Sequence, residues 1–149
     1  MHRTGAILLA VAAATPAAAA EGGIEVSRVW MPAVAQTRVD APLYMAIVNR
    51  ADAPDTLLRA RCPTDLADFT EKHVTDRGEG GLAMREVKTL PVPARETLTL
   101  APNGSHLMLL GVREPLQEGR TFTCSVVFQK AGTIRVEVKV AADGTKEAP

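Results

Sequence analysis

Strict alternation of apolar and polar residues is the main pattern along residues 21–149. The clearest segment runs from 134 to 140, where apolar residues occupy every second position: Ile134, Val136, Val138 and Val140. A period of two places alternate side chains on opposite faces of a β-strand. Residues 121–128 alternate in the same way, with Cys124 on the apolar face, and 129–132 supply a turn with a glycine. We therefore predict a β-hairpin over 121–140.

Other segments have the same strand character and are separated by turn residues rich in Gly, Pro, Asn and Asp. They are 24–31, 42–50, 55–62, 67–75, 82–88, 95–100 and 104–111. No segment has sustained apolar residues at helical spacing. About eight or nine short antiparallel strands predict an all-β fold, a β-sandwich or barrel with Greek-key connections. Residues 141–149 are expected to form a flexible tail.

The first 20 residues have the plan of a secretory signal peptide. A basic start is followed by an apolar run from 5 to 14 and by small residues up to Ala20, after which we expect cleavage. The apolar run is shorter than the roughly 20 residues that span a bilayer; the alternative is an N-terminal anchor. We thus expect a periplasmic protein with one domain over 21–149 and no membrane span.

Composition excludes several function classes. The 17 basic and 17 acidic residues cancel, so the chain lacks the positive charge that nucleic-acid binding needs. Nucleophile and zinc-protease motifs are absent from the sequence, and the glycine-rich segment 78–81 has the character of a turn rather than a phosphate loop. We predict that the protein is not an enzyme.

The two cysteines, Cys62 and Cys124, are expected to form a disulfide, as is usual in an exported chain. Their separation does not match a CxxC redox motif. The alternative is two separate buried thiols.

The soft metal-ligand residues of the chain are few. Met31 and Met45 lie in apolar strand patterns and are expected in the core. His106 and Met108 are two residues apart on a predicted strand, so both point to one face, outward, while Leu107 and Leu109 point to the core.

A second pair, His73 and Met84, lies in the predicted hairpin around Gly78. A turn centred on Gly78 and Glu79 would place His73 directly opposite Met84. If the two places meet, two imidazoles and two thioethers converge. Thioethers are soft neutral donors that suit Cu(I) and are poor ligands for Ca²⁺, Mg²⁺ or Zn²⁺.

The spacing of these four residues is H-x10-M-x21-H-x-M. It resembles the signature of the periplasmic copper chaperones for the CuA centre of cytochrome c oxidase. The surrounding segments 44–49, 102–109, 115–119 and 128–132 are similar to that family as well, so the resemblance covers roughly 24–140.

The resemblance implies a cupredoxin-like Greek-key β-sandwich that binds one Cu(I) ion near its surface. The implied metal ligands are His73, Met84, His106 and Met108. The implied partners are the oxidase subunit that carries the CuA site and a thioredoxin-like copper chaperone. The sequence departs from the family at Thr75, where many members have Met, and in 141–149, which lacks the His and Met of some members.

Two other functions fit the same residues. A periplasmic copper storage or tolerance protein would use the same ligand set. A metal-free β-sandwich binding module would use the four residues only for packing and hydrogen bonding. An electron-transfer cupredoxin is disfavoured, because no suitably spaced His and Met follow Cys124.

Overall fold

The computed structural model describes residues 18–19 and 23–149, and the described chain is built from β-strands without a helix. The predicted signal peptide, 1–20, lies outside the described residues apart from 18–19. The strands are β1 (Ala18–Ala19), β2 (Ile24–Pro32), β3 (Val39–Asn49), β4 (Asp55–Arg61), β5 (Phe69–Gly78), β6 (Gly81–Val87), β7 (Leu90–Val92), β8 (Thr97–Leu100), β9 (His106–Val112), β10 (Thr121–Phe128) and β11 (Gly132–Ala141). In this part of the chain no helix is long and apolar enough to cross a membrane.

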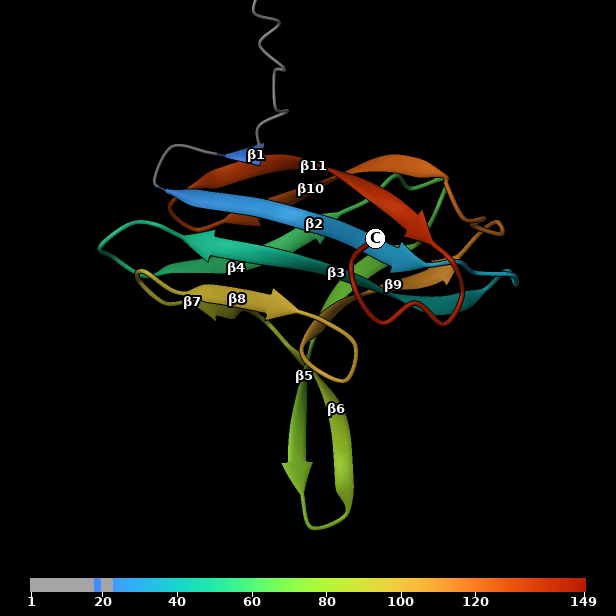
Figure 1. Ribbon diagram of the computed structural model, residues 1–149, viewed down its shortest axis with the longest axis horizontal. Helices are drawn as coiled ribbons and strands as arrows, with labels where there is room; N and C mark the ends of the chain where they lie inside the picture. Colours follow the sequence, from blue (N-terminus) through green and yellow to red (C-terminus); the bar gives the residue numbers. More distant parts are fainter. Residues whose placement is uncertain (1–17, 20–22) are drawn as a thin grey trace, which may run out of the picture.

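The strands form one sheet in the order β6-β5-β9-β3-β2-β11-β10-β4-β7, with β8 paired to β3 and β1 to β2. β3 serves both parts of the sheet: residues 39–43 pair with β9, and residues 44–49 pair with β2. The sheet folds over at this strand into the two layers of a sandwich (Figure 1). The all-β sandwich predicted from the alternating pattern is confirmed.

Nine of the observed strands correspond to the predicted ones. The two additional strands, β1 and β7, have only two and three residues. β7 contains Pro91. A proline is tolerated in this strand because β7 is the last strand in the order and therefore an edge strand. One pairing departs from the antiparallel prediction: β2 and β11 run parallel where Trp30 lies opposite Lys139.

The core lies between the layers and follows the period-two pattern. In β11 the even-numbered residues 134–140 are buried and the odd-numbered residues 133–139 are not, and in β10 Cys124 lies opposite Val136. Met31 and Met45 are fully buried, as predicted. Cys62 and Cys124 form a disulfide, which joins the end of β4 to its neighbour β10.

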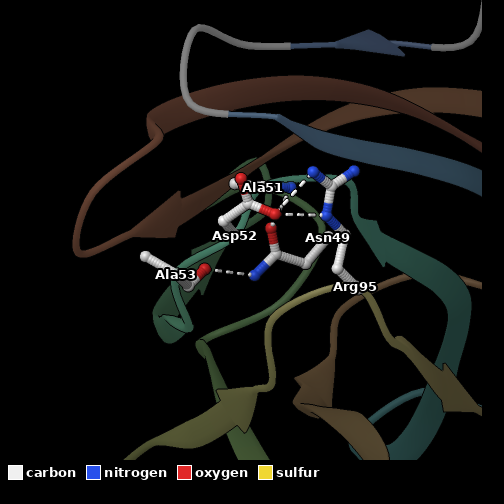
Figure 2. Close-up of polar contacts among 5 residues, drawn as sticks. All are labelled: Asn49, Ala51, Asp52, Ala53 and Arg95. Atoms are coloured by element: carbon white, nitrogen blue, oxygen red, sulfur yellow. Dashed lines mark hydrogen bonds and ion pairs between the residues drawn. The ribbon is translucent and has the colours of Figure 1, made fainter.

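Two buried polar side chains organise the turns at one end of the sandwich; we call Asn49 and Asp55 the loop hub. Asn49 donates to the Ala53 carbonyl at 2.9 Å and accepts from the Ala51 amide at 3.0 Å (Figure 2). It also donates to the Val92 carbonyl at 3.2 Å. The same view shows Arg95 bound to Asp52 across this loop. The Asp55 carboxylate accepts three backbone N–H groups, from Thr56, Lys130 and Ala131, at 2.7–2.9 Å.

The hairpin of β5 and β6 projects from the body of the sandwich (Figure 1). Its turn is Glu79–Gly80, with Gly78 opposite Gly81, so the turn lies one residue later than predicted and the predicted cross-strand partners are wrong by two residues. Gly81 has φ of +100°, which glycine adopts without the steric cost of a side chain, and this places the turn one residue later than predicted. His73 therefore lies opposite Glu86, and Met84 lies opposite Thr75.

Candidate metal centre

All four predicted ligands belong to three adjacent strands, β9, β5 and β6. His106 lies directly opposite His73 across β9 and β5. On β9, Met108 lies two residues beyond His106; on β6, Met84 lies two residues before Glu86, the residue opposite His73. Because residues two apart share a face of a strand, the four side chains lie on one face of the sheet. The prediction that the four side chains share a face was correct, although the predicted cross-strand partner of His73 was wrong.

His106 points to the predicted face but is buried, with 5% of its surface exposed, so the expectation of an outward histidine is wrong. Tyr44 of β3 covers it edge-on, with the ring centroids 6.3 Å apart. The Nδ1 atom of His106 lies 2.9 Å from the Gly104 carbonyl oxygen. A carbonyl only accepts hydrogen bonds, so Nδ1 carries the proton and Nε2 of the neutral ring keeps a free lone pair.

His73 makes a different hydrogen bond. Its Nε2 atom lies 2.9 Å from a carboxylate oxygen of Glu71, two residues earlier on the same face of β5. An ionised carboxylate only accepts, so in His73 the donor is Nε2 and the lone pair of the neutral ring is on Nδ1. The rings of His73 and His106 pack edge to face, with centroids 5.4 Å apart.

The free ring nitrogens are the unusual feature of this face. In the described part of the chain, two buried side-chain nitrogen or oxygen atoms lack a hydrogen-bond partner, and they are Nδ1 of His73 and Nε2 of His106. A buried polar atom without a partner costs about 1–3 kcal/mol. Two such atoms on adjacent rings are what a site for a bound electrophile, such as a metal ion, requires.

The two thioethers differ in exposure. Met84 on the projecting hairpin is 60% exposed, whereas Met108 is half-buried. Met84, His106 and Met108 line a cavity of 380 Å³ together with Thr75, Tyr44 and Gly104. His73 does not line this cavity but packs beside it, against His106. The cavity thus opens the buried histidine to solvent on the side of the exposed Met84.

Aromatic packing supports the site from β3 and β2. Tyr44 contacts Trp30 at a centroid distance of 4.9 Å on the side away from His106. These are the one Tyr and the one Trp of the sequence. Burial raises the pKa of the Tyr44 phenol, so this wall of the cavity stays neutral. The row of Trp30, Tyr44, His106 and His73 continues to Glu86 across five strands.

A cation lies next to the site on the other face of β5. Lys72 is largely buried, and this burial lowers the pKa of its ammonium group, while Glu86 and Glu71 oppose the shift. The charge balance near the histidines therefore includes two carboxylates and one ammonium group.

Three supporting groups were missed in the sequence. Glu71 holds His73, the Gly104 carbonyl holds His106, and the Thr75 hydroxyl donates to the same carbonyl at 2.9 Å. Glu71 could have been found, because it lies two residues before His73 and must share its face. The role of the Gly104 carbonyl could not have been found, because every residue has a backbone oxygen and the sequence does not distinguish this one.

The donor types among the four predicted ligands on this face are imidazole and thioether. No group of three or more His, Cys, Asp and Glu side chains in residues 18–19 and 23–149 is arranged to hold a metal ion. Met84 and Met108 add two sulfur atoms to the imidazoles on this face, and such a mixed donor set favours a soft ion.

Solved structures of similar proteins share this fold. In the copper-bound PCuAC domain from PmoF2, 26% of residues are identical over 86% of this chain and 99% of that one, with a TM-score of 0.71. The solution structure of CuI-DR1885 from Deinococcus radiodurans is 29% identical over 83% and 82% of the two chains, with a TM-score of 0.60. These neighbours confirm the predicted cupredoxin-like β-sandwich.

The sequence comparisons define the family. A protein of Leifsonia xyli subsp. xyli (strain CTCB07), called "Putative lipoprotein Lxx21020", is 31% identical over 136 residues, which are 91% of this chain and 79% of that protein. Residues 24–140 match the family described as "Putative lipoprotein LpqE-like". The chain belongs to this LpqE-like family.

Proposed function

We propose that this protein is an exported, periplasmic metallochaperone that binds one Cu(I) ion through His73, Met84, His106 and Met108. We further propose that it delivers the ion to the CuA site of cytochrome c oxidase. It acts as a carrier and not as an enzyme, with copper as its cargo.

One observation carries the proposal for copper: the lone pairs on Nδ1 of His73 and Nε2 of His106 are buried and unpartnered on adjacent rings. Their cost in the free protein is recovered when an ion binds them. The nearby sulfur atoms select the ion, because thioethers bind Cu(I) well and hard cations poorly. Thioethers also stay available in an oxidising compartment, where the cysteines of this chain are paired.

The differing exposure of the donors supports a carrier role. Met84 is exposed on a projecting hairpin, whereas His106 is buried, His73 is partly buried, and both rings are hydrogen-bonded. An incoming donor can displace the weakly bound Met84 thioether first, without unfolding the site. Export is supported by the word lipoprotein in the names of the family and of the relative.

Binding is tested by anaerobic titration of Cu(I) into the purified protein against a competing chelator, with native mass spectrometry for stoichiometry. We expect one tight equivalent, and a large loss of affinity in His106→Ala and in the double variant Met84→Leu/Met108→Leu. Asn49→Ala, at the far loop hub, is the control. Absence of Cu(I) binding by the folded wild-type protein would reject the proposal in favour of a metal-free module.

Delivery is tested separately. The Cu(I)-loaded protein is incubated anaerobically with the copper-free soluble CuA-bearing domain of an oxidase subunit II, with and without a reduced thioredoxin-like copper chaperone. Ferricyanide then removes one electron from the colourless Cu(I)–Cu(I) product, and the optical bands of the mixed-valence CuA centre are recorded. We expect the bands to appear with the loaded protein and to form more slowly with free Cu(I) under chelator. Tight binding without transfer would instead indicate storage or tolerance.

A further inference from the structure

The two histidines of the site leave different ring nitrogens without a hydrogen-bond partner. His106 donates from Nδ1 to a backbone carbonyl, and His73 donates from Nε2 to the Glu71 carboxylate. The unpartnered atoms are accordingly Nε2 in one ring and Nδ1 in the other. Without Glu71 neither the tautomer nor the orientation of His73 would be fixed: the neutral ring can carry its proton on either nitrogen, and a 180° turn about the Cβ–Cγ bond exchanges each nitrogen with a ring carbon.

We propose that Glu71 is a positioning residue that holds His73 protonated on Nε2, so that Cu(I) is bound by Nδ1 of His73 and Nε2 of His106. The part of this inference that concerns Cu(I) binding rests on the proposed function. Its first half, the tautomer and orientation of His73, concerns the copper-free protein and can be tested without the metal.

The surroundings of Glu71 fit a positioning role better than a ligand role. One carboxylate oxygen lies 2.9 Å from His73, and the side chain is three-quarters buried beside Met108, its neighbour across β5 and β9. The bond to a charged acceptor inside a partly buried face is stronger than a bond to water. A metal-bound histidine whose other nitrogen donates to a carboxylate binds its metal more tightly, and loss of such a partner costs about 10–100-fold in affinity.

The chain offers a matched control in Glu86. This residue lies directly opposite His73 on the other neighbouring strand, and both carboxylates act on the Lys72 ammonium. Glu86 is exposed, and among the hydrogen bonds of the described residues His73 bonds to Glu71 and not to Glu86. Removing either residue deletes one negative charge next to His73, but only the Glu71 change deletes the hydrogen bond.

The experiment records long-range ¹H–¹⁵N NMR spectra of the histidine rings in wild type, Glu71→Leu, Glu71→Gln and Glu86→Leu. Spectra are taken copper-free at a pH above the ordinary imidazole range, then with Cu(I), and the Cu(I) affinity of each variant is measured. Wild type should show His73 as the pure Nε2–H tautomer, and Cu(I) should shift Nδ1 of His73 and Nε2 of His106.

Glu71→Leu should move the His73 nitrogens toward exchange-averaged shifts and weaken Cu(I) binding about 10–100-fold. Glu71→Gln keeps a side-chain acceptor, so it should retain the tautomer and most of the affinity. Glu86→Leu should leave the tautomer unchanged.

Three results would overturn the inference: an unchanged His73 tautomer in Glu71→Leu, Cu(I) bound through Nε2 of His73 in wild type, or equal affinity losses in Glu71→Leu and Glu86→Leu. A wild-type protein that shows the expected tautomer but binds no Cu(I) would refute the proposed function while leaving the role of Glu71 in the free protein intact.

Discussion

The loop hub and the histidine pair of the metal centre both bury polar atoms but use them in opposite ways. Asn49 and Asp55 are 1% and 5% exposed, and their side chains bind the backbone of several turns. His106 is also 5% exposed, yet one nitrogen of its ring and one of His73 have no partner in the described chain. In the loop hub the buried polar atoms form hydrogen bonds that stabilise the fold. In the metal centre two buried ring nitrogens stay unpaired and available to a ligand.

This difference can be tested because each region should respond to substitution in only one property. Changes at the loop hub should lower the free energy of unfolding without changing Cu(I) affinity per folded molecule. Changes at the histidines should do the reverse.

The largest effect is expected for Cu(I) affinity in His106→Leu. Loss of a buried nitrogen donor should weaken binding about 1000-fold, which corresponds to about 4 kcal/mol. The measurement is anaerobic chelator competition. Asn49→Ala, measured at a temperature where it remains folded, should bind Cu(I) within about twofold of wild type. A comparable loss in both variants would mean that the two regions are not separable.

The next effect concerns stability at the loop hub. Asp55→Ala removes the acceptor of three backbone N–H groups and should lower the free energy of unfolding by about 3 kcal/mol. Urea unfolding followed by circular dichroism measures it through the midpoint. Asp55→Asn keeps one acceptor oxygen and should lose about half as much. An Asp55→Ala midpoint equal to that of wild type would show that solvent replaces these bonds without cost.

A smaller effect of opposite sign is expected for the stability of copper-free His106→Leu. The substitution removes an unpartnered nitrogen but also frees the Gly104 carbonyl, so stability should stay equal or rise by about 1 kcal/mol. The same urea titration measures it, with excess chelator present. A loss as large as that of Asp55→Ala would indicate that His106 is a structural residue of the core.

In this fold the two-residue period of the sequence predicts which face of a strand each side chain occupies. It predicts less reliably which residue lies opposite on the next strand. The predicted pairing of the hairpin was wrong by two residues, so Glu86 and not Met84 lies opposite His73. Because two is an even number, Met84 is still on the face of His73. The four residues were therefore brought to one face correctly, from a wrong pairing.

Long-range packing was beyond the reach of the pattern. The parallel contact of β2 with β11 joins segments about 100 residues apart and has no local signature. The burial of His106 depends on Tyr44, which belongs to another strand and is itself backed by Trp30. Pro91 cannot donate a backbone N–H group to a strand pairing, and the position of β7 at the end of the sheet is what makes a strand acceptable there.

The smallest expected effect concerns Thr75, which lies opposite Met84 and supports His106 indirectly. Its hydroxyl donates to the Gly104 carbonyl, the same oxygen that accepts Nδ1–H of His106. Thr75→Val keeps the shape and the strand propensity but removes this donor, so the carbonyl becomes free to move. Cu(I) affinity should fall about threefold, which corresponds to less than 1 kcal/mol.

Thr75→Ser is the matched variant, because it restores the hydroxyl while removing a methyl group, and it should recover wild-type affinity. If Val and Ser weaken binding equally, the methyl packing and not the hydrogen bond matters at this position. If neither weakens it, Gly104 is held by its own turn, where its amide donates to the Ala101 carbonyl at 3.0 Å. The orientation of the His106 ring would then be set by the backbone of the turn that holds Gly104. The contrast between the loop hub and the metal centre would in that case depend on their turns as well as on their side chains.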